Sequence, residues 1–313
     1  FYQAAAGYLE RVYGVAGINP ETQILHGIGS KPILAMLPAC FINPGDITLA
    51  TVPGYPVLST WTRYMGGEVY DLPLTRENDF YPDFRQIPGD ILKKAKLLYI
   101  NYPNNPTGQT ATREFYEKVV DFAKENSILV IADSAYAHLT YDGEVPLSFL
   151  SVPGAMEVGI ELHSLSKAFN MTGWRLAFAA GNEKMIKAYG TVKDNSDSGQ
   201  FRAIQKAGIY ALDHPEITDQ IAEKYSRRFK AVKPKGSFFL YTKAPVGGGN
   251  VSFDGAEEAA RFLIEKGGIS VVPWSDAGQY LRFSVTFEAD SAEEEKRIIQ
   301  EVQDRLVRLD LRF

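Results

Sequence analysis

Short apolar runs alternate with helical stretches over the first half of the chain, and this alternation constrains the fold more than any other feature. The β-rich runs lie at 47–50, 68–72, 97–100, 128–132 and 158–162, with helical patterns at 1–13, 57–65 and 112–125. Strands that are apolar throughout are typical of a parallel sheet buried on both faces. We therefore expect an α/β fold with a mostly parallel central sheet covered by helices.

The pattern changes near residue 210, and a chain of 313 residues exceeds what one hydrophobic core usually organises. The later elements are expected as helices at 203–212, 215–228, 256–265 and 292–307, strands at 238–241, 269–272 and 281–285, and a loop tip at 247–250. This order predicts a large domain over 1–209 and a smaller α+β domain over 210–313.

Composition excludes several classes of function. With 33 Lys+Arg against 38 Asp+Glu the net charge is −5, so we expect no nucleic-acid partner. No stretch approaches a membrane span, the four histidines lack metal-ligand spacing, and no leader pattern follows Phe1, although the natural start could lie upstream. The single cysteine, Cys40, lies in an apolar run and favours a reducing compartment. We expect a cytoplasmic protein with neither a membrane association nor a metal site.

The first candidate site segment is the turn at 26–32, His-Gly-Ile-Gly-Ser-Lys-Pro, ahead of an apolar helical run. Two glycines, a hydroxyl N-cap at Ser30 and an early proline open a helix whose free amides can hold a phosphate. The turn fits neither the Rossmann nor the Walker pattern, because Pro32 occupies the deciding position in both. A plain strand-to-helix turn explains it equally well.

Two further segments directly follow apolar strands, where α/β sheets keep their ligands. The run 101–108 reads Asn-Tyr-Pro-Asn-Asn-Pro-Thr-Gly, a composition that by itself predicts only a rigid turn. Asp133 ends another strand, with Tyr136 three residues later. An acid at that place needs cationic compensation unless it caps a helix.

The fourth segment, 164–175, reads Ser-Leu-Ser-Lys-Ala-Phe-Asn-Met-Thr-Gly-Trp-Arg. A lysine among apolar neighbours has its charged form disfavoured, which suits a covalent bond to an aldehyde, although a surface lysine is the plain alternative. Taken together, the four segments supply every part that a pyridoxal phosphate site needs.

At this point the sequence resembles the fold type I pyridoxal-phosphate aminotransferases, over nearly its whole length. The motifs that carry the resemblance are 104–108, 133–136, and 164–167 with 173–175. Within that family the stretches 197–205 and 272–287 resemble the LL-diaminopimelate branch most.

The resemblance implies a role for each motif residue. Lys167 would bond the cofactor and move the substrate Cα proton, Asp133 would hold the pyridine nitrogen, and Tyr136 and Asn105 would hydrogen-bond the ring 3-oxygen. Tyr55 would stack on the ring, and the alternative is that it is an aromatic residue of the core. Arg282, with Asn105, would bind the substrate carboxylate, and the alternative for Arg282 is a structural salt bridge. The phosphate would be held by Ser30, Lys31, Ser164, Ser166 and Arg175.

The resemblance further implies a homodimer with shared active sites and a transamination between LL-2,6-diaminopimelate with 2-oxoglutarate and tetrahydrodipicolinate with glutamate, in lysine biosynthesis. The alternatives are an aminotransferase for aspartate, alanine or aromatic amino acids, a lyase on the same scaffold, and the effector-binding module of a transcription regulator. The resemblance also shows two departures, because relatives carry a longer segment before residue 1 and a longer link around 227–237. Either a naturally shortened chain or residues missing at both places explains these departures.

Overall fold

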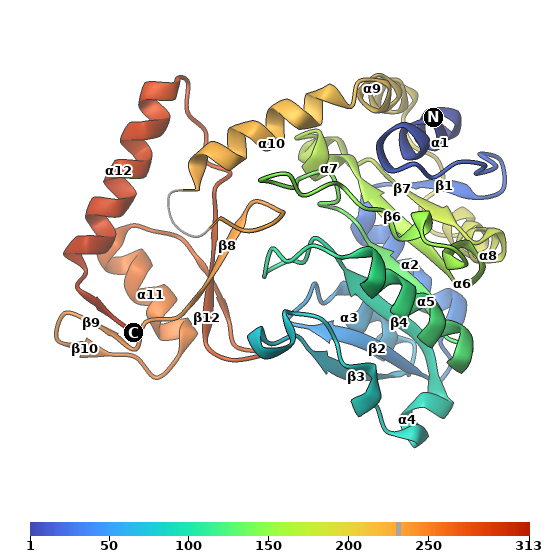
Figure 1. Ribbon diagram of the computed structural model, residues 1–313, viewed down its shortest axis with the longest axis horizontal. Helices are drawn as coiled ribbons and strands as arrows, with labels where there is room; N and C mark the ends of the chain where they lie inside the picture. The colour runs from blue at the N-terminus through green and yellow to red at the C-terminus, as the bar shows by residue number, and fades with distance from the viewer. Residues whose placement is uncertain (230–232) are drawn as a thin grey trace.

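The computed structural model describes residues 1–229 and 233–313 and contains one large sheet and two small ones. The large sheet has seven strands in the order β1-β7-β6-β5-β4-β2-β3 (Figure 1). Their bounds are β1 Ile24–Gly27, β2 Ile47–Val52, β3 Glu68–Pro73, β4 Ala95–Asn101, β5 Leu129–Asp133, β6 Gly159–Ser164 and β7 Ala177–Gly181. All neighbouring pairs from β6 to β3 are parallel, whereas β7 runs antiparallel to both of its neighbours. The prediction of an α/β fold with a mostly parallel sheet is confirmed.

Helices cover both faces of this sheet and thereby bury its central strands on both sides. One face packs against α2 (Ser30–Phe41), α3 (Val57–Tyr64) and α8 (Glu183–Asp194). The other face packs against α1 (Tyr2–Tyr13), α5 (Arg113–Asn126), α6 (Ala155–Val158) and α9 (Arg202–Asp213). Every residue of β6 and nearly every residue of β4 and β5 is buried, which fixes where the ends of these strands lie.

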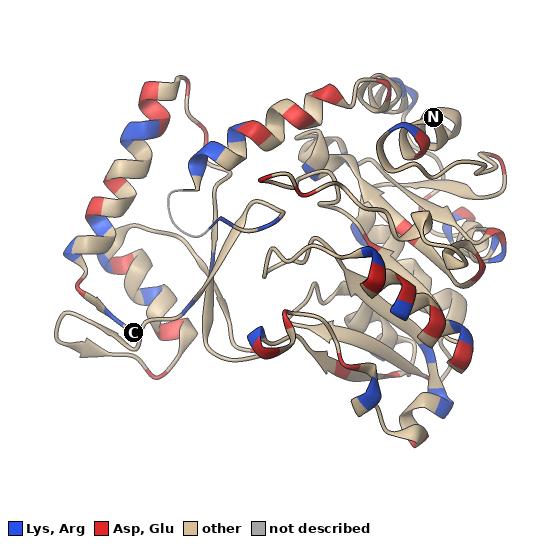
Figure 2. Ribbon diagram, viewed as in Figure 1, with Lys and Arg blue, Asp and Glu red and all other residues tan. Residues whose placement is uncertain are grey.

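The C-terminal part lies beside the large sheet and is reached through α10 (Glu216–Arg228) (Figure 1). It contains an antiparallel sheet in the order β11-β12-β8 and a second small sheet in the order β10-β9-β13. The bounds are β8 Phe239–Lys243, β9 Gly247–Gly248, β10 Val251–Ser252, α11 Ala256–Gly267, β11 Val272–Trp274, β12 Tyr280–Ser284, α12 Ala292–Arg308 and β13 Leu311–Arg312. Basic and acidic side chains both occur along α10 and α12 (Figure 2), as expected for helices with one solvent-facing side.

An apolar cavity of about 650 Å³ lies between the β11-β12-β8 sheet and α12. Leu240, Leu281 and Phe283 line it from the sheet, and Val302 and Leu306 line it from the helix. No residue of α12 is fully buried, so this helix covers the sheet without closing on it.

Several expected elements differ from the structure. Strands β1 and β7 were not predicted, because both are short and β7 consists mainly of alanine and glycine, which are poor strand formers. The strand expected at 269–272 lies instead at β11, where Pro273 is tolerated because β11 is an edge strand. In the expected loop tip at 247–250, the first two residues pair as β9 and only the last two form the turn. The expected shortened link at 227–237 falls partly on 230–232, outside the described residues.

Within the described ranges 1–229 and 233–313, no helix combines the length and apolar character that crossing a membrane requires.

Candidate active site

The predicted site residues converge on one cavity of about 330 Å³ at the carboxyl ends of β4, β5 and β6. All eleven line it: Ser30, Lys31, Tyr55, Asn105, Asp133, Tyr136, Ser164, Ser166, Lys167, Arg175 and Arg282. Four further residues that the sequence reasoning did not select complete the lining: Asn101, Ala135, Thr172 and Phe239. The lining carries four cationic side chains and one carboxylate, so the cavity favours an anionic ligand.

The beginning of α2 forms one wall of the cavity. The N-cap of this helix is Gly29, not Ser30 as predicted from the sequence, and it makes no side-chain cap. Gly29 has a φ of 86°, and a Cβ there would lie 2.2 Å from Nη2 of Arg175. The glycine therefore leaves room for the guanidinium beside the free amides of the helix, which is the arrangement that binds phosphate groups.

Arg175 is held in place by the turn that precedes it. Its Nη1 donates to the carbonyl oxygen of Thr172 at 2.7 Å and to Oγ of Ser166 at 3.5 Å. Oγ of Ser164 accepts from the amide of Ser166 at 3.3 Å, so the hydroxyls at 164 and 166 face the same end of the cavity as the guanidinium. Together these groups offer a fixed set of donors to a phosphate.

Asp133 is the single carboxylate of the lining, and its side chain is 4% exposed. Its Oδ2 accepts from the hydroxyl of Tyr99 at 3.0 Å, and its Oδ1 accepts from the amide of Ala135 at 3.3 Å. Burial raises the pKa of Asp133 to about 6, although the hydrogen bonds from Tyr99 and Ala135 act against the rise. The carboxylate is therefore ionised at neutral pH in a place where charge is costly.

Asn101 ties the ends of two strands together. Its Nδ2 donates to the carbonyl oxygen of Asp133 at 2.8 Å, and its Oδ1 accepts from the amide of Asn105 at 2.9 Å. These two bonds fix the turn after β4 against the end of β5. The rigid turn expected from the sequence is thus present, and it sets the position of Asn105 in the cavity.

Lys167 lies on the short helix α7 (Leu165–Ala168), directly after β6. Burial lowers the pKa of Lys167, and the nearby positive charges of Arg282 and Arg175 lower it further. A lower pKa increases the fraction of free amine, which is the form that attacks an aldehyde or accepts a proton.

Arg282 comes from the C-terminal part, on β12, and reaches into the cavity. Its guanidinium carbon lies 4.0 Å from the ring centroid of Phe239 and 5.4 Å from that of Trp274, and its Nη1 donates to Oδ1 of Asn105 at 2.7 Å. Its buried Nε has no hydrogen-bond partner among the described residues. Burial lowers the pKa of Arg282, although Tyr136 acts in the opposite direction. An arginine stacked between rings and short of partners is suited to bind a carboxylate of a ligand.

Two tyrosines, together with Phe239, line the cavity. Tyr136 packs edge-on against Phe239 with ring centroids 5.7 Å apart, and the ring of Tyr55 lies 5.8 Å from Nζ of Lys31. Burial raises the pKa of Tyr136, so its phenol is protonated and can donate to a ligand oxygen. Tyr55 is only partly buried, which leaves its ring accessible from the cavity.

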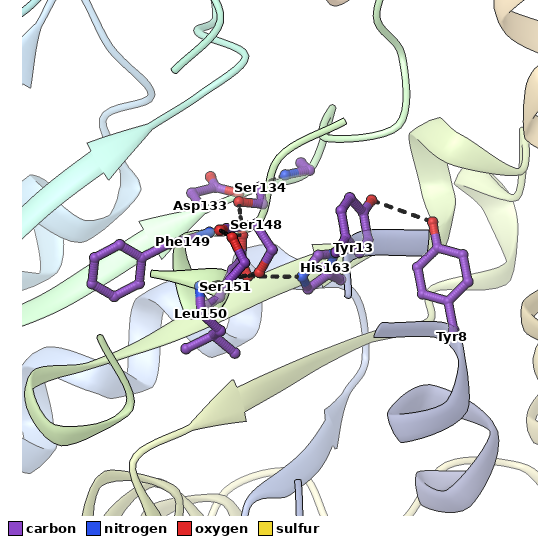
Figure 3. A network of polar contacts seen from close by, with 11 residues as sticks. Tyr8, Tyr13, Asp133, Ser134, Ser148, Phe149, Leu150, Ser151 and His163 are labelled. Carbon is purple, nitrogen blue, oxygen red and sulfur yellow. Dashed lines mark hydrogen bonds and ion pairs between the residues drawn. The ribbon is translucent and has the colours of Figure 1, made fainter. Parts of the chain in front are cut away.

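A second buried carboxylate lies on the neighbouring strand and was not selected by the sequence reasoning. Glu161 is 0% exposed; it accepts from the hydroxyls of Ser134 and Ser148 and from the amide of Phe149, and lies 3.3 Å from Nε2 of His163. Figure 3 shows Ser134, Ser148, Phe149 and His163 in one network of polar contacts, with Ser134 next to Asp133. His163 lies on the same strand, but the three hydrogen-bond donors come from other segments, so no local motif in the sequence indicates the cluster.

The chain was compared with known proteins. Residues 1–299 match the family described as aminotransferase class I and II. The LL-diaminopimelate aminotransferases of Methanocaldococcus jannaschii and Methanococcus maripaludis are 54% and 52% identical, over 99% and 98% of this chain and 79% and 78% of their own lengths. The alignment with the Methanocaldococcus jannaschii protein extends over 330 positions, which is more than the 313 residues of this chain. Some residues of that relative within the matched region therefore have no counterpart in this chain.

Among solved structures, apo-BacF from Bacillus subtilis has a TM-score of 0.90 at 37% identity, covering 99% of this chain and 84% of that one. An aminotransferase from Staphylococcus aureus has a TM-score of 0.87 at 29% identity, with coverage of 99% and 83%. The cavity therefore belongs to a fold that these proteins share with this chain over nearly its whole length.

Proposed function

Because the chain belongs to the class I and II aminotransferases, we propose that it transfers an amino group from LL-2,6-diaminopimelate to 2-oxoglutarate, and in reverse from glutamate to tetrahydrodipicolinate, in lysine biosynthesis. The observation that carries the choice of substrate is the 54% identity to a relative named LL-diaminopimelate aminotransferase. Seven further relatives at 40–52% identity carry the same name, two of them with the number 2 added.

We propose pyridoxal 5′-phosphate as the cofactor, because the donor set of the cavity matches each of its polar groups. Arg175, the two serine hydroxyls and the start of α2 suit the phosphate, and the glycine at position 29 leaves room for the Arg175 guanidinium beside the helix amides. Asp133 suits a protonated ring nitrogen, and Lys167 suits an aldehyde. When bound, the cofactor supplies an electron sink for the pair left at the substrate Cα after deprotonation.

The remaining roles fall to residues of the chain. Nζ of Lys167 accepts the proton from the substrate Cα and returns one at the other reacting carbon, because its lowered pKa increases the free-amine fraction. Asp133 would hold a positive charge at the ring nitrogen of the bound cofactor, since its carboxylate is ionised above about pH 6. Asn105 and Tyr136 would bind the ring oxygen of the cofactor, and Tyr55 would contact its ring, since all three side chains line the cavity.

Arg282 orients the substrate. Its guanidinium is positioned by Phe239 and by Asn105, and it lines the cavity from the C-terminal part. A substrate α-carboxylate on Arg282 is thereby fixed at a defined distance from Lys167. Such positioning accounts for a large share of the rate enhancement in enzymes of this kind.

The test is a coupled assay of glutamate formation from LL-diaminopimelate and 2-oxoglutarate by the purified protein loaded with pyridoxal 5′-phosphate. We expect turnover, and we expect Lys167→Ala to lose the visible absorbance band of the lysine-bound cofactor together with the activity. The exposed Lys118→Ala serves as the matched control. No glutamate from LL-diaminopimelate, with ready turnover of aspartate, alanine or an aromatic amino acid, would reject the substrate; a fully active Lys167→Ala protein would reject the site.

We further propose that the protein acts as a homodimer in the cytoplasm. Phe201, the N-cap of α9, and Tyr210 on the same helix are 72% and 62% exposed, so α9 presents two large aromatic side chains that a partner could cover. The single Cys40 is not paired, as is usual in a reducing compartment. Light scattering of the purified protein tests the dimer, since a monomeric mass at micromolar concentration would reject it.

A further inference from the structure

Tyr99 lies beneath the cavity and contacts its single carboxylate. The side chain is 1% exposed, and its hydroxyl donates to Oδ2 of Asp133 at 3.0 Å. Asp133 lines the cavity and Tyr99 does not, so the hydroxyl reaches the carboxylate from the protein side. The bond leaves the open side of Asp133 to a ligand.

The surroundings of Tyr99 are otherwise mainly apolar, with the phenols of Tyr55 and Tyr136 near enough to raise its pKa further. Strand β4 pairs with β5 in a register that places Tyr99 opposite Ile131 and Asn101 opposite Asp133. Tyr99 belongs to the same buried cluster as Leu97 and Leu162. A hydroxyl in such a place is costly unless it is bonded, so its presence calls for an explanation at its one polar contact.

We propose that Tyr99 is a positioning residue of the active site, whose hydroxyl fixes the Asp133 carboxylate and keeps it charged beneath the ring nitrogen of the bound cofactor. This inference rests on the cofactor proposed above. Asp133 and Lys167 line the cavity and would contact the bound cofactor, whereas Tyr99 acts through Asp133.

The direction of the hydrogen bond is determined by burial. Burial raises the pKa of Tyr99 well above its ordinary value, and the adjacent Asp133 raises it further, so the phenol is protonated and must donate. The other groups that act on the charge of Asp133 are the Ala135 amide and His163 on β6, both of which lower its pKa. Tyr136 lies close enough to Asp133 for the carboxylate to raise the pKa of the Tyr136 phenol. Tyr99 is the largest of the influences that favour the charged form of Asp133.

The experiment compares Tyr99→Phe with the wild type in two readouts. The first is the pKa of the Asp133 carboxyl in the cofactor-free full chain, from ¹³C NMR titration of labelled aspartate, with the signal assigned by its loss in Asp133→Asn. Loss of one donor should raise this pKa by about one unit, equivalent to a tenfold change in proton affinity. The second is the split between kcat and KM of the loaded enzyme, in which kcat should fall about tenfold while both KM values stay within about twofold.

Tyr102→Phe is the matched control. Tyr102 follows the same strand, is also 1% exposed, and donates to the carbonyl oxygen of Phe80 at 2.7 Å, away from the cavity. Tyr102→Phe should lower the free energy of unfolding as much as Tyr99→Phe does, and it should leave the pKa of Asp133 unchanged. If Tyr99→Phe does not fold, 3-fluorotyrosine at position 99 keeps the shape, strengthens the donor, and should lower the Asp133 pKa instead.

An Asp133 pKa that stays at its wild-type value in Tyr99→Phe, or in the fluorinated protein if only that one folds, overturns the proposal and leaves Tyr99 as a packing residue. A raised pKa with unchanged kcat overturns its link to turnover. Because the titration needs no cofactor, it remains decisive even if the wild type fails to bind pyridoxal 5′-phosphate, a result that would reject the proposed function alone.

Discussion

Two buried carboxylates on adjacent strands face opposite sides of the large sheet, and their pKa values are shifted in opposite directions. Ala132 pairs with Glu161 and Asp133 with Leu162, so the two acids point to different faces. Burial raises the pKa of Asp133 to about 6. Burial also acts to raise the pKa of Glu161, but His163 and the hydroxyls of Ser134 and Ser148 outweigh it and leave the pKa lowered.

The difference lies in the number of partners. Glu161 accepts hydrogen bonds from three donors and lies 3.3 Å from Nε2 of His163, in a buried cluster that does not line the cavity. Asp133 has two donors and an open side in the cavity. A fully satisfied buried charge contributes to the fold, whereas a partly satisfied one costs stability and is available for binding.

The largest expected effect is the loss of activity in Asp133→Asn. Removing the charge that faces the ring nitrogen should lower kcat by about 100- to 1,000-fold, comparable to losing one preorganised electrostatic contact. The same change should stabilise the cofactor-free protein at pH 7, by up to roughly 3 kcal/mol, because two pKa units of unfavourable ionisation are removed. Rates and urea unfolding measure the two effects, with the exposed Asp121→Asn as control. Loss of both activity and stability would contradict the comparison.

Glu161→Gln should have the reverse profile. It removes the negative partner of His163 and weakens the bonds to Ser134 and Ser148, so the free energy of unfolding should fall by about 3 kcal/mol. The activity per folded molecule should change by less than about threefold, because Glu161 does not line the cavity. Urea denaturation measures the loss, and the exposed Glu125→Gln should stay within about 0.5 kcal/mol of the wild type. A large fall in kcat with normal stability would assign Glu161 to the site.

The pH dependence of stability should separate the two acids. The folded-state pKa of Asp133 is raised above its ordinary 3.8. The stabilising contribution of this acid to the free energy of unfolding is therefore present below pH 3.8 and is lost as the pH rises through about 6. The folded-state pKa of Glu161 is lowered, so its contribution is present above about pH 4.5 and is lost as the pH falls through its folded-state value. Subtracting the unfolding free energies of Asp133→Asn and Glu161→Gln from those of the wild type between pH 3 and 7 should give slopes of opposite sign. Equal slopes would show that both acids titrate alike.

The smallest expected effect is that of Ser134→Ala. Ser134 follows Asp133 in the chain, but its hydroxyl bonds Glu161. Its removal should lower the free energy of unfolding by about 1 kcal/mol and leave kcat within about twofold. Thermal unfolding and steady-state rates check both, and a tenfold loss of kcat would show that the two faces of the sheet are coupled through this residue.

Hydrophobic patterning predicted most of the large sheet, because burial on both faces requires runs such as those at 97–100 and 128–132. The predicted site residues were found in one cavity because their motifs follow parallel strands, whose carboxyl ends meet at one edge. Their individual roles remain predictions, as does the domain boundary near residue 210, which falls within α9.

What could not be predicted depends on contacts between distant segments. Tyr99 looks like one more apolar strand residue in the sequence, and only the register of β4 against β5 brings its hydroxyl to Asp133. Glu161 sits in a run expected to be apolar, and its partner Ser148 lies outside every motif that was considered. Phe239 was assigned to a strand, but its place beside Arg282 follows from how that strand sits relative to the large sheet.

The apolar cavity between α12 and the β11-β12-β8 sheet has a consequence for how this part of the molecule can be observed. The cavity is open to solvent on one side, and apolar surface of this kind is a site where an apolar fluorescent dye can bind. Leu281 and Phe283, the neighbours of Arg282 on β12, both line this cavity. A dye bound there should therefore report on the strand that carries Arg282, from the side of the sheet that faces α12.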